Sequence, residues 1–326
     1  MYGRWIMDEV LEETEADVRY RQYDATWKEA INTYFESFVE LFWPEIYDKI
    51  DWSKGYELLE QEFHLMHQYQ KKDKSITDKL IKVFRHDGKE AWVLILIEIQ
   101  GQRDPDFAER IFIYFYKAYE RYRKPIACLA IFIDPHPNWR PSQFELELWD
   151  TNLTLKFPIM KVLDYKNKQE FLRKSINPFA AVILAQLAAI EAAGKNEVML
   201  ISKLDILKCL YIRNADYKEI LEQYRYMEGL LPLSKDFSLQ YHREIKRIEE
   251  EHCMSYITTA IEENRIEGKI EGKIEGELEM LFTLLNVKFG NIPKFYLEQL
   301  QRADAKHLLE LGKKLITSSS IEEIFG

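Results

Sequence analysis

The chain has 326 residues, of which 47% are hydrophobic, and its three cysteines form no CxxC pair; this allows a main domain with smaller pieces and excludes a cysteine-ligated zinc module. The formal net charge of -10 counts against a nucleic-acid partner unless positive charge is gathered locally. The few cysteines, the absence of signal-peptide features and the short apolar runs predict a cytoplasmic protein without membrane contact.

The first third of the chain predicts helices followed by a hairpin. Residues 24–43 show apolar residues at helical spacing, which predicts an amphipathic helix that Pro44 ends. Residues 56–70 are ambiguous, and we assign them to a helix. Residues 76–84 mix apolar and charged side chains as a strand does, and the Asp-Gly pair within 86–89 is a strong turn signal. This segment therefore predicts the first strand and the turn of a β-hairpin.

The next segment predicts a βαβ unit. Residues 91–99 are almost all apolar and rich in β-branched side chains, which indicates a strand buried on both faces. Pro105 suits the first turn of a helix that runs to Arg123, and residues 126–133 form another apolar strand. Strand, helix and strand in this order predict a parallel pair joined by a crossover, and therefore an α/β fold.

The second half of the chain predicts mostly helices. One or two strands are expected within 143–163. The predicted helices that follow span 178–193, 198–213, 216–229 and 236–263. The predicted domain boundaries are 1–175 for the α/β domain, 176–263 for a helical region, 264–278 for a connector and 279–326 for a small helical C-terminal domain.

The connector contains the repeat Ile-Glu-Gly-Lys-Ile-Glu-Gly-Lys-Ile-Glu-Gly-Glu. Each of its glycines costs a helix about 1 kcal/mol against alanine. Two interpretations stay open, a flexible charged linker, which we favour, and a helix whose glycine edge lets a second helix approach. The second one would allow homo-oligomer formation through the C-terminal helical region.

Two acidic residues lie on the two strands of the predicted hairpin, at the end away from its turn. Glu98 and Gln100 are two residues apart, so both project to one face of the strand while Ile99 projects to the other. Asp78 lies on the preceding strand, and a turn near 87–88 brings it close to Glu98. Two neighbouring carboxylates repel each other, and a divalent cation relieves that repulsion.

Oxygen ligands of this kind favour Mg²⁺ or Mn²⁺ over zinc. The alternative for Asp78 is a solvated strand residue or a salt bridge with Lys79 or Lys82. A lone strand aspartate fits that alternative better. Its combination with Glu98 and Gln100 after an apolar strand favours a metal site.

The spacing of Asp78 from Glu98-Ile99-Gln100 resembles that of the PD-(D/E)XK nuclease superfamily, and most closely that of the Rpn family of recombination-promoting nucleases and transposases. The glycine-glutamate repeat and the helical tail are also similar, so the resemblance covers most of the chain. The matching stretches are 77–83, 92–102, 107–114 and 177–180.

The resemblance implies an αβββαβ nuclease core and a metal-dependent DNA endonuclease linked to recombination or mobile elements. It assigns the metal to Asp78, Glu98 and the backbone carbonyl of Ile99. Gln100 stands where the superfamily usually has a lysine. A glutamine can orient the attacking water but supplies no positive charge, so the metal must supply most of the electrostatic stabilisation. We therefore expect weak or conditional activity.

A basic stripe on the predicted helix supports DNA as the substrate. The window 79–124 holds ten Lys or Arg against seven Asp or Glu, so it is positive within an acidic chain. The alternative is an ordinary solvated face whose late cations complement the helix dipole. The expected DNA-contacting residues are Arg103, Arg110, Tyr114, Lys117 and Arg121, with Lys124 on the same stripe.

Two other functions remain open. The first is a catalytically weak or inactive nuclease fold that binds DNA, which Gln100 and the acidic total charge favour. The second is an assembly protein, in which the repeat and the tail mediate oligomer formation and the α/β core is a scaffold.

Overall fold

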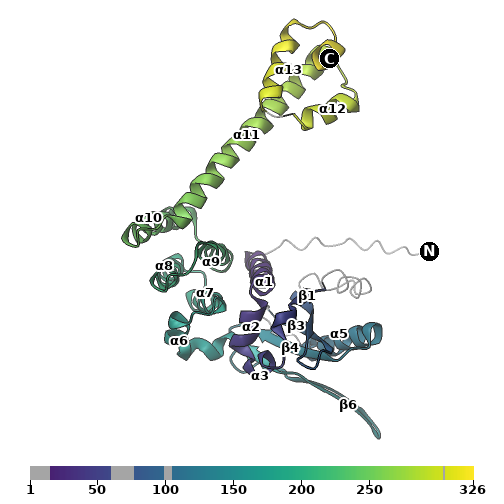
Figure 1. Cartoon of the computed structure of the whole chain (residues 1–326), viewed down its shortest axis with the longest axis vertical. Helices are drawn as coiled ribbons and strands as arrows, with labels where there is room; N and C mark the ends of the chain where they lie inside the picture. The colour runs from purple at the N-terminus through teal and green to yellow at the C-terminus, as the bar shows by residue number, and fades with distance from the viewer. Residues whose placement is uncertain (1–14, 60–76, 99–104, 304) are drawn as a thin grey trace, which may run out of the picture. The chain divides into compact units, whose positions relative to one another are not determined.

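The computed structural model describes two compact units. Unit 1 is Met1–Met254 and unit 2 is Ser255–Gly326. Unit 1 is a mixed α/β unit in which helices precede and follow a five-stranded sheet, and unit 2 is helical (Figure 1). The residues that the structure describes are 15–59, 77–98, 105–303 and 305–326.

A mixed sheet lies at the centre of unit 1. Its strands are β1 (Tyr56–Leu58), β2 (Thr77–Phe84), β3 (Glu90–Glu98), β4 (Ile126–Phe132) and β7 (Ile159–Lys161). Their order is β1-β2-β3-β4-β7. β2 is antiparallel to both of its neighbours, β1 and β3, whereas β3, β4 and β7 run parallel to one another. The predicted hairpin is confirmed, with Gly88 at a φ of 80° in its turn.

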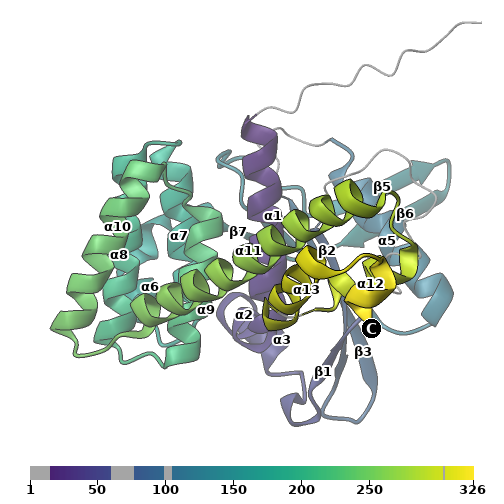
Figure 2. The ribbon, with the colours of Figure 1, turned by 90° about the horizontal axis from the view of Figure 1, so that it is seen from above.

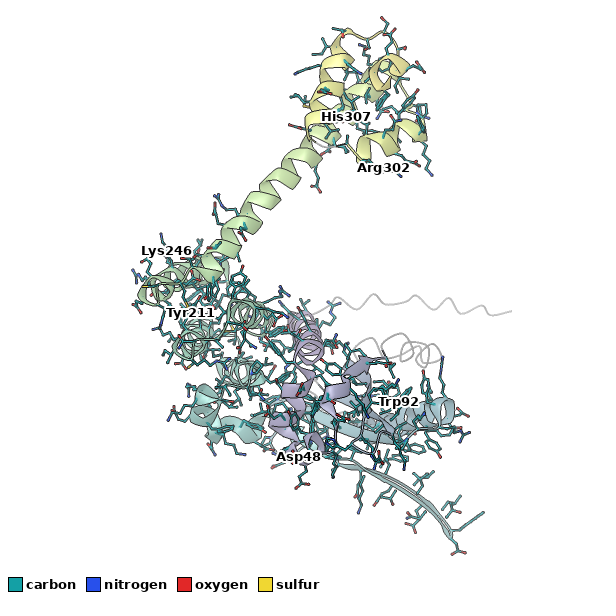
Figure 3. All side chains as sticks on the ribbon, in the orientation of Figure 1. Asp48, Trp92, Tyr211, Lys246, Arg302 and His307 are labelled. Carbon is teal, nitrogen blue, oxygen red and sulfur yellow. The ribbon has the colours of Figure 1, made fainter. Side chains whose placement is uncertain are left out.

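Helix α5 (Phe107–Tyr122) covers one face of this sheet. It connects β3 to the parallel β4, as the βαβ pattern predicts. Four of its residues at helical spacing, from Phe107 to Ala118, are buried, and they pack against even-numbered strand residues such as Leu80 and Trp92 (Trp92 is labelled in Figure 3). Because side chains alternate between faces along a strand, the even-numbered positions of β2, β3 and β4 face α5.

Helices from both ends of unit 1 pack together beside the sheet (Figure 2). Trp27 Nε1 donates a hydrogen bond of 2.9 Å to Gln186 Oε1, and the rings of Phe38 and Phe179 lie 4.9 Å apart. Residues after 176 therefore complete the core around the N-terminal helices. The helices are α1 (Glu15–Thr33), α2 (Phe35–Phe42), α3 (Pro44–Tyr47), α6 (Gln169–Lys174), α7 (Phe179–Ala192), α8 (Asn196–Ile212), α9 (Tyr217–Leu230) and α10 (Lys235–Glu251).

Three predicted elements differ from the structure. The helix predicted over 24–43 begins earlier and is interrupted at Tyr34, whose φ of -125° is not helical. The first residues of the helix predicted over 56–70 form β1, which pairs with β2, and the rest of that range, from 60 on, lies outside the described residues. The helix predicted over 236–263 ends at Glu251, before the left-handed Cys253.

The region 143–163 holds three strands rather than one or two. The third is β7. The other two, β5 (Gln143–Leu148) and β6 (Thr151–Lys156), form a two-stranded antiparallel hairpin that is separate from the main sheet.

Unit 2 has a core of its own. The helix α11 (Tyr256–Phe289) runs without interruption through the glycine-glutamate repeat, so the segment predicted as a connector lies within a helix. Three short helices follow, and their apolar residues pack with Leu281 and Leu285 of α11. These helices are α12 (Lys294–Gln301), α13 (Ala305–Thr317) and α14 (Ile321–Phe325).

The close approach of α9 to α1 gives a test of this architecture. A Cβ added to Gly229 would lie 2.0 Å from Thr26 Oγ1 and 3.2 Å from Thr26 Cβ. We expect Gly229→Ala to lower the free energy of unfolding by about 1–3 kcal/mol, the usual cost of overpacking.

The control for Gly229→Ala is the double variant Gly229→Ala with Thr26→Ala, because it removes the obstructing side-chain atoms. Thermal and urea unfolding of both variants would show partial recovery in the double variant. Equal destabilisation of the two would contradict this packing.

Candidate functional site

The β2–β3 register places Asp78 and Glu98 on one face of the sheet. Asp78 pairs with Leu96, not with Glu98, and Glu98 follows two residues later on β3. Because strand residues alternate between faces, all three share a face. Diagonal positions of this kind lie about 7–8 Å apart, a separation that two carboxylate residues binding one cation can bridge.

The face that carries Asp78 and Glu98 is the one that α5 covers. Leu80 is two residues after Asp78 and packs in the α5 cluster. Trp92, six residues before Glu98, packs in the same cluster. An even separation keeps each pair on one face, so the two acidic positions lie on the α5 side.

The first turn of α5 lies over the end of the sheet that holds Glu98. Glu98 pairs with Phe132 in the parallel β3–β4 ladder. The ring of Phe107, the first residue of α5, lies 5.0 Å from the ring of Phe132. The guanidinium carbon of Arg110 lies 5.4 Å from the Phe107 ring. The register and the ring contacts therefore bring Arg110 to the row of the sheet that contains Glu98.

A buried ion pair occupies the same row. Lys161 pairs with Phe132 in the β4–β7 ladder, and its Nζ donates a 2.7 Å hydrogen bond to Asp134 Oδ2. Both side chains are fully buried. Lys161 Nζ also donates to the carbonyl oxygen of Trp139 and lies 5.4 Å from the Phe132 ring. Burial lowers the pKa of Lys161, while the Asp134 carboxylate opposes that shift.

The ion pair fixes the carboxyl end of β4 next to Glu98. Asp134 Oδ1 accepts a hydrogen bond from the backbone N–H of His136, so the loop after β4 is held as well. Neither Asp134 nor Lys161 was expected from the sequence. The only signal was that Asp134 ends the apolar strand 126–133, as Glu98 nearly ends its own strand.

Asp24 and Lys28 of α1 lie on the other face of the sheet. Lys28 Nζ donates a 2.8 Å hydrogen bond to Asp24 Oδ2. Burial raises the pKa of Asp24, and the charges of Lys28 and Lys79 oppose the shift. Lys79 is buried and occupies an odd-numbered position of β2, on the face opposite Asp78. Asp24 is inside α1 rather than at its start.

The expected DNA-contacting residues occupy different environments. Tyr114 is only 1% exposed and packs in the α5 cluster, so its role in this fold is packing rather than surface contact. Arg110 and Lys117 are half-buried, and Arg121 is exposed with its guanidinium over the Tyr122 ring. Arg103 lies outside the described residues.

Lys124 differs from the rest of the stripe. Its Nζ lies 2.8 Å from Glu90 Oε2, and this ion pair ties the end of α5 to the start of β3. The exposed charge of the stripe is therefore concentrated at Arg121, with Lys117 and Arg110 closer to the sheet.

Of the expected metal ligands, Asp78 and Glu98 are placed by the strand register alone. Carboxylate oxygens are the ligands that Mg²⁺ and Mn²⁺ prefer in proteins. Ile99 and Gln100, the other two expected site residues, lie outside the described residues. Within the described part of the chain, no group of three or more His, Cys, Asp or Glu side chains could hold a metal ion.

Other chemical sites are less favourable. A pocket of about 530 Å³ is lined by Ile50, Val83 and Arg85, so it lies at the hairpin end of the strands, away from Asp78 and Glu98. Cys128 is buried in the α5 cluster, and burial raises the pKa of its thiol to about 12. A thiol in that state is not a nucleophile at neutral pH.

The ion pair between Asp134 and Lys161 can be tested by a double-mutant cycle. Lys161→Met leaves the Asp134 carboxylate buried without its counter-charge, so we expect the free energy of unfolding to fall by about 3–5 kcal/mol. Adding Asp134→Asn removes that charge and keeps an oxygen for the His136 N–H, so the double variant should be more stable than Lys161→Met alone. Urea unfolding of the wild type, of Lys161→Met, of Asp134→Asn and of the double variant completes the cycle. Strictly additive losses would show that the two residues are not coupled.

Comparisons with known proteins assign no family to this chain. A scan against protein-family models, a search of curated proteins and a search of solved structures each found no match. Within the described residues, no helix combines the length and apolar character that crossing a bilayer requires.

Proposed function

We propose that this protein is a divalent-metal-dependent DNA endonuclease with a PD-(D/E)XK-like core. The observation that carries the proposal is the β2–β3 register, which puts Asp78 and Glu98 on the same face of the sheet. Apart from α2, α3 and a 3-10 turn between α1 and β1, the order α1, β1, β2, β3, α5, β4 is that of the αβββαβ core that the resemblance to the Rpn family implies. A role in recombination or mobile elements rests on that resemblance alone.

Asp78, Glu98 and the backbone carbonyl of Ile99 would hold Mg²⁺ or Mn²⁺. A bound ion of this kind polarises a phosphoryl oxygen and lowers the pKa of a water ligand. Gln100 orients the attacking water through its amide. Phe132 pairs with Glu98 on the sheet and contacts the ring of Phe107. The guanidinium of Arg110 lies over that Phe107 ring. Arg110 therefore adds positive charge near Glu98.

Positive charge on α5 would attract the phosphate backbone of a nucleic acid to the proposed metal site. Arg121 is exposed and Lys117 is half-buried on this helix. Cations at these positions suit phosphate contacts, which position a nucleic acid without reading its sequence. Since Gln100 adds no charge, the metal and the two cations of α5 would have to stabilise the negative charge of the transition state.

Plasmid nicking in the presence of Mg²⁺ or Mn²⁺ tests the proposal. We expect Asp78→Asn and Glu98→Gln each to reduce the nicking rate at least about 100-fold, the scale expected when a group that stabilises transition-state charge is lost. Glu57→Gln is the matched control, because Glu57 lies on the same sheet with an exposed side chain and pairs with Lys82.

Circular dichroism would confirm that all these variants are folded. Equal nicking by the wild type and every variant would point to a contaminating nuclease and remove the proposal. Retained DNA binding without nicking by the wild type would favour the non-catalytic binding module, which is the alternative that Gln100 suggests.

A second candidate function is assembly through unit 2. Met280, Leu284 and Val287 of α11 are spaced by four and three residues, so they form one apolar stripe on the helix. All three are exposed, and Val287 is 80% exposed. An exposed stripe at this spacing is suited to packing against another helix, which favours oligomer formation by unit 2.

Static light scattering on the full chain tests assembly through α11. We expect Leu284→Lys with Val287→Lys to lower the molar mass in solution, because two charges interrupt the stripe. The control, Leu309→Lys with Ile316→Lys, changes two exposed apolar residues of α13 and should leave the mass unchanged. An unchanged mass for both pairs would exclude the α11 stripe as an interface.

A further inference from the structure

The β5–β6 hairpin is an arm with one apolar face and one polar face. The arm extends beyond the rest of unit 1 (Figure 1). Its register pairs Leu146 with Leu153, so these residues share a face, together with Phe144 and Leu148. Glu145 and Glu147 lie on the opposite face. The alternation is that of a strand pair with one buried side, although unit 1 buries only its base.

The outer part of the arm leaves its apolar face exposed. The exposed fractions are 57% for Leu146, 60% for Leu148, 37% for Leu153 and 89% for Trp149. An isolated two-stranded hairpin is at best marginally stable in water, and neighbouring exposed apolar residues indicate an interaction surface.

The residue at the tip of the arm, Trp149, has a backbone conformation that is unfavourable for a bulky side chain. Trp149 has a φ of 52°, a left-handed conformation that glycine and asparagine adopt at much lower cost than a bulky residue. A tryptophan here contributes neither an easy turn nor a buried side chain within unit 1. A partner that covers the indole would account for its presence at the tip.

The apolar face continues onto the outer side of α5. Phe144 at the base of the arm stacks on Phe112 of α5, with ring centroids 4.7 Å apart and planes 10° apart. Phe112 in turn stacks with Tyr116, which is 50% exposed, and Tyr119 one turn later is 44% exposed. We call these three α5 residues the aromatic shelf. The arm and the aromatic shelf therefore form one continuous apolar strip.

Charges beside the strip are complementary within the same chain. The arm carries Glu145, Glu147 and Asp150 against a single lysine, so it is acidic. The end of α5 is basic, with Arg121 and Arg123 both exposed. An acidic arm repels nucleic acids and anionic lipid surfaces. The basic end of α5 attracts an acidic arm.

We propose that the arm binds a second copy of this chain, with its apolar face on that copy's aromatic shelf. Both halves of the interface are present in each chain, so a two-fold axis satisfies both at once. Trp149 is then covered by apolar side chains, and Asp150, the next residue at the tip, lies near the partner copy's Arg123. This interface is in unit 1 and is independent of the α11 stripe.

The concentration dependence of the molar mass of the full chain tests the proposal. To separate this interface from the α11 stripe, every chain in this test carries Leu284→Lys with Val287→Lys. The chain with no further change, called the wild type of this test, should reach twice the 39.0 kDa chain mass. We expect Trp149→Asn and Leu148→Glu each to weaken dimerisation at least about 10-fold, as substitutions at interface hot spots do. Because asparagine relieves the left-handed strain at 149, a loss of the dimer in that variant does not result from unfolding.

The matched control is Ile176→Glu, which changes an 85% exposed apolar residue outside the strip. It should dimerise like the wild type. A wild type that stays monomeric at all concentrations, or arm variants that dimerise normally, would overturn the proposal. Arm variants that lose DNA binding with an unchanged mass would overturn it too, because the arm would then be a DNA contact.

Cross-linking distinguishes the arrangement within the dimer. A Leu148→Cys chain and a Tyr119→Cys chain are mixed and oxidised, both with Cys253→Ser because Cys253 is exposed. A disulfide between the two different chains supports the arm on the shelf. Disulfides only between two Leu148→Cys chains would show arm-to-arm packing and overturn this arrangement.

Discussion

The register of β2 against β3 is the constraint on which the rest of the site depends. Each strand alternates its residues between two faces, so a shift of one residue would move Asp78 to the face covered by α1 while Glu98 stayed under α5. The apolar even-numbered positions resist such a shift, because Leu80 and Trp92 would leave the α5 cluster. Core packing therefore fixes the relative position of the two acidic residues.

The elements that the sequence predicted well are those with local signals. The Asp-Gly turn, the apolar run of β3 and the periodicity of α5 each depend on neighbouring residues, and all three elements are present within a few residues of the predicted bounds. The same reasoning predicted that Asp78 and Glu98 would come close. It missed the two-residue offset between them, because the strand pairing depends on both strands and the turn together.

The features that were not predictable depend on contacts between distant residues. β1 has three residues and exists because β2 pairs with it. Lys161 appears in the sequence as an ordinary charged residue, and only the parallel ladder shows that it is buried beside Phe132 with Asp134 as its partner. Tyr114 was placed on a surface stripe because periodicity gives the angular position of a residue on a helix but not what covers it.

The hydrogen bond from Trp27 to Gln186 links the first helix of unit 1 to a helix that follows the α/β elements. The α/β elements end near residue 175, yet the buried indole of α1 depends on a side chain from α7. A chain cut at 175 would leave that indole and the ring of Phe38 facing water. The smallest fragment that keeps this core intact is therefore set by the helices that complete it, and it extends to about residue 254.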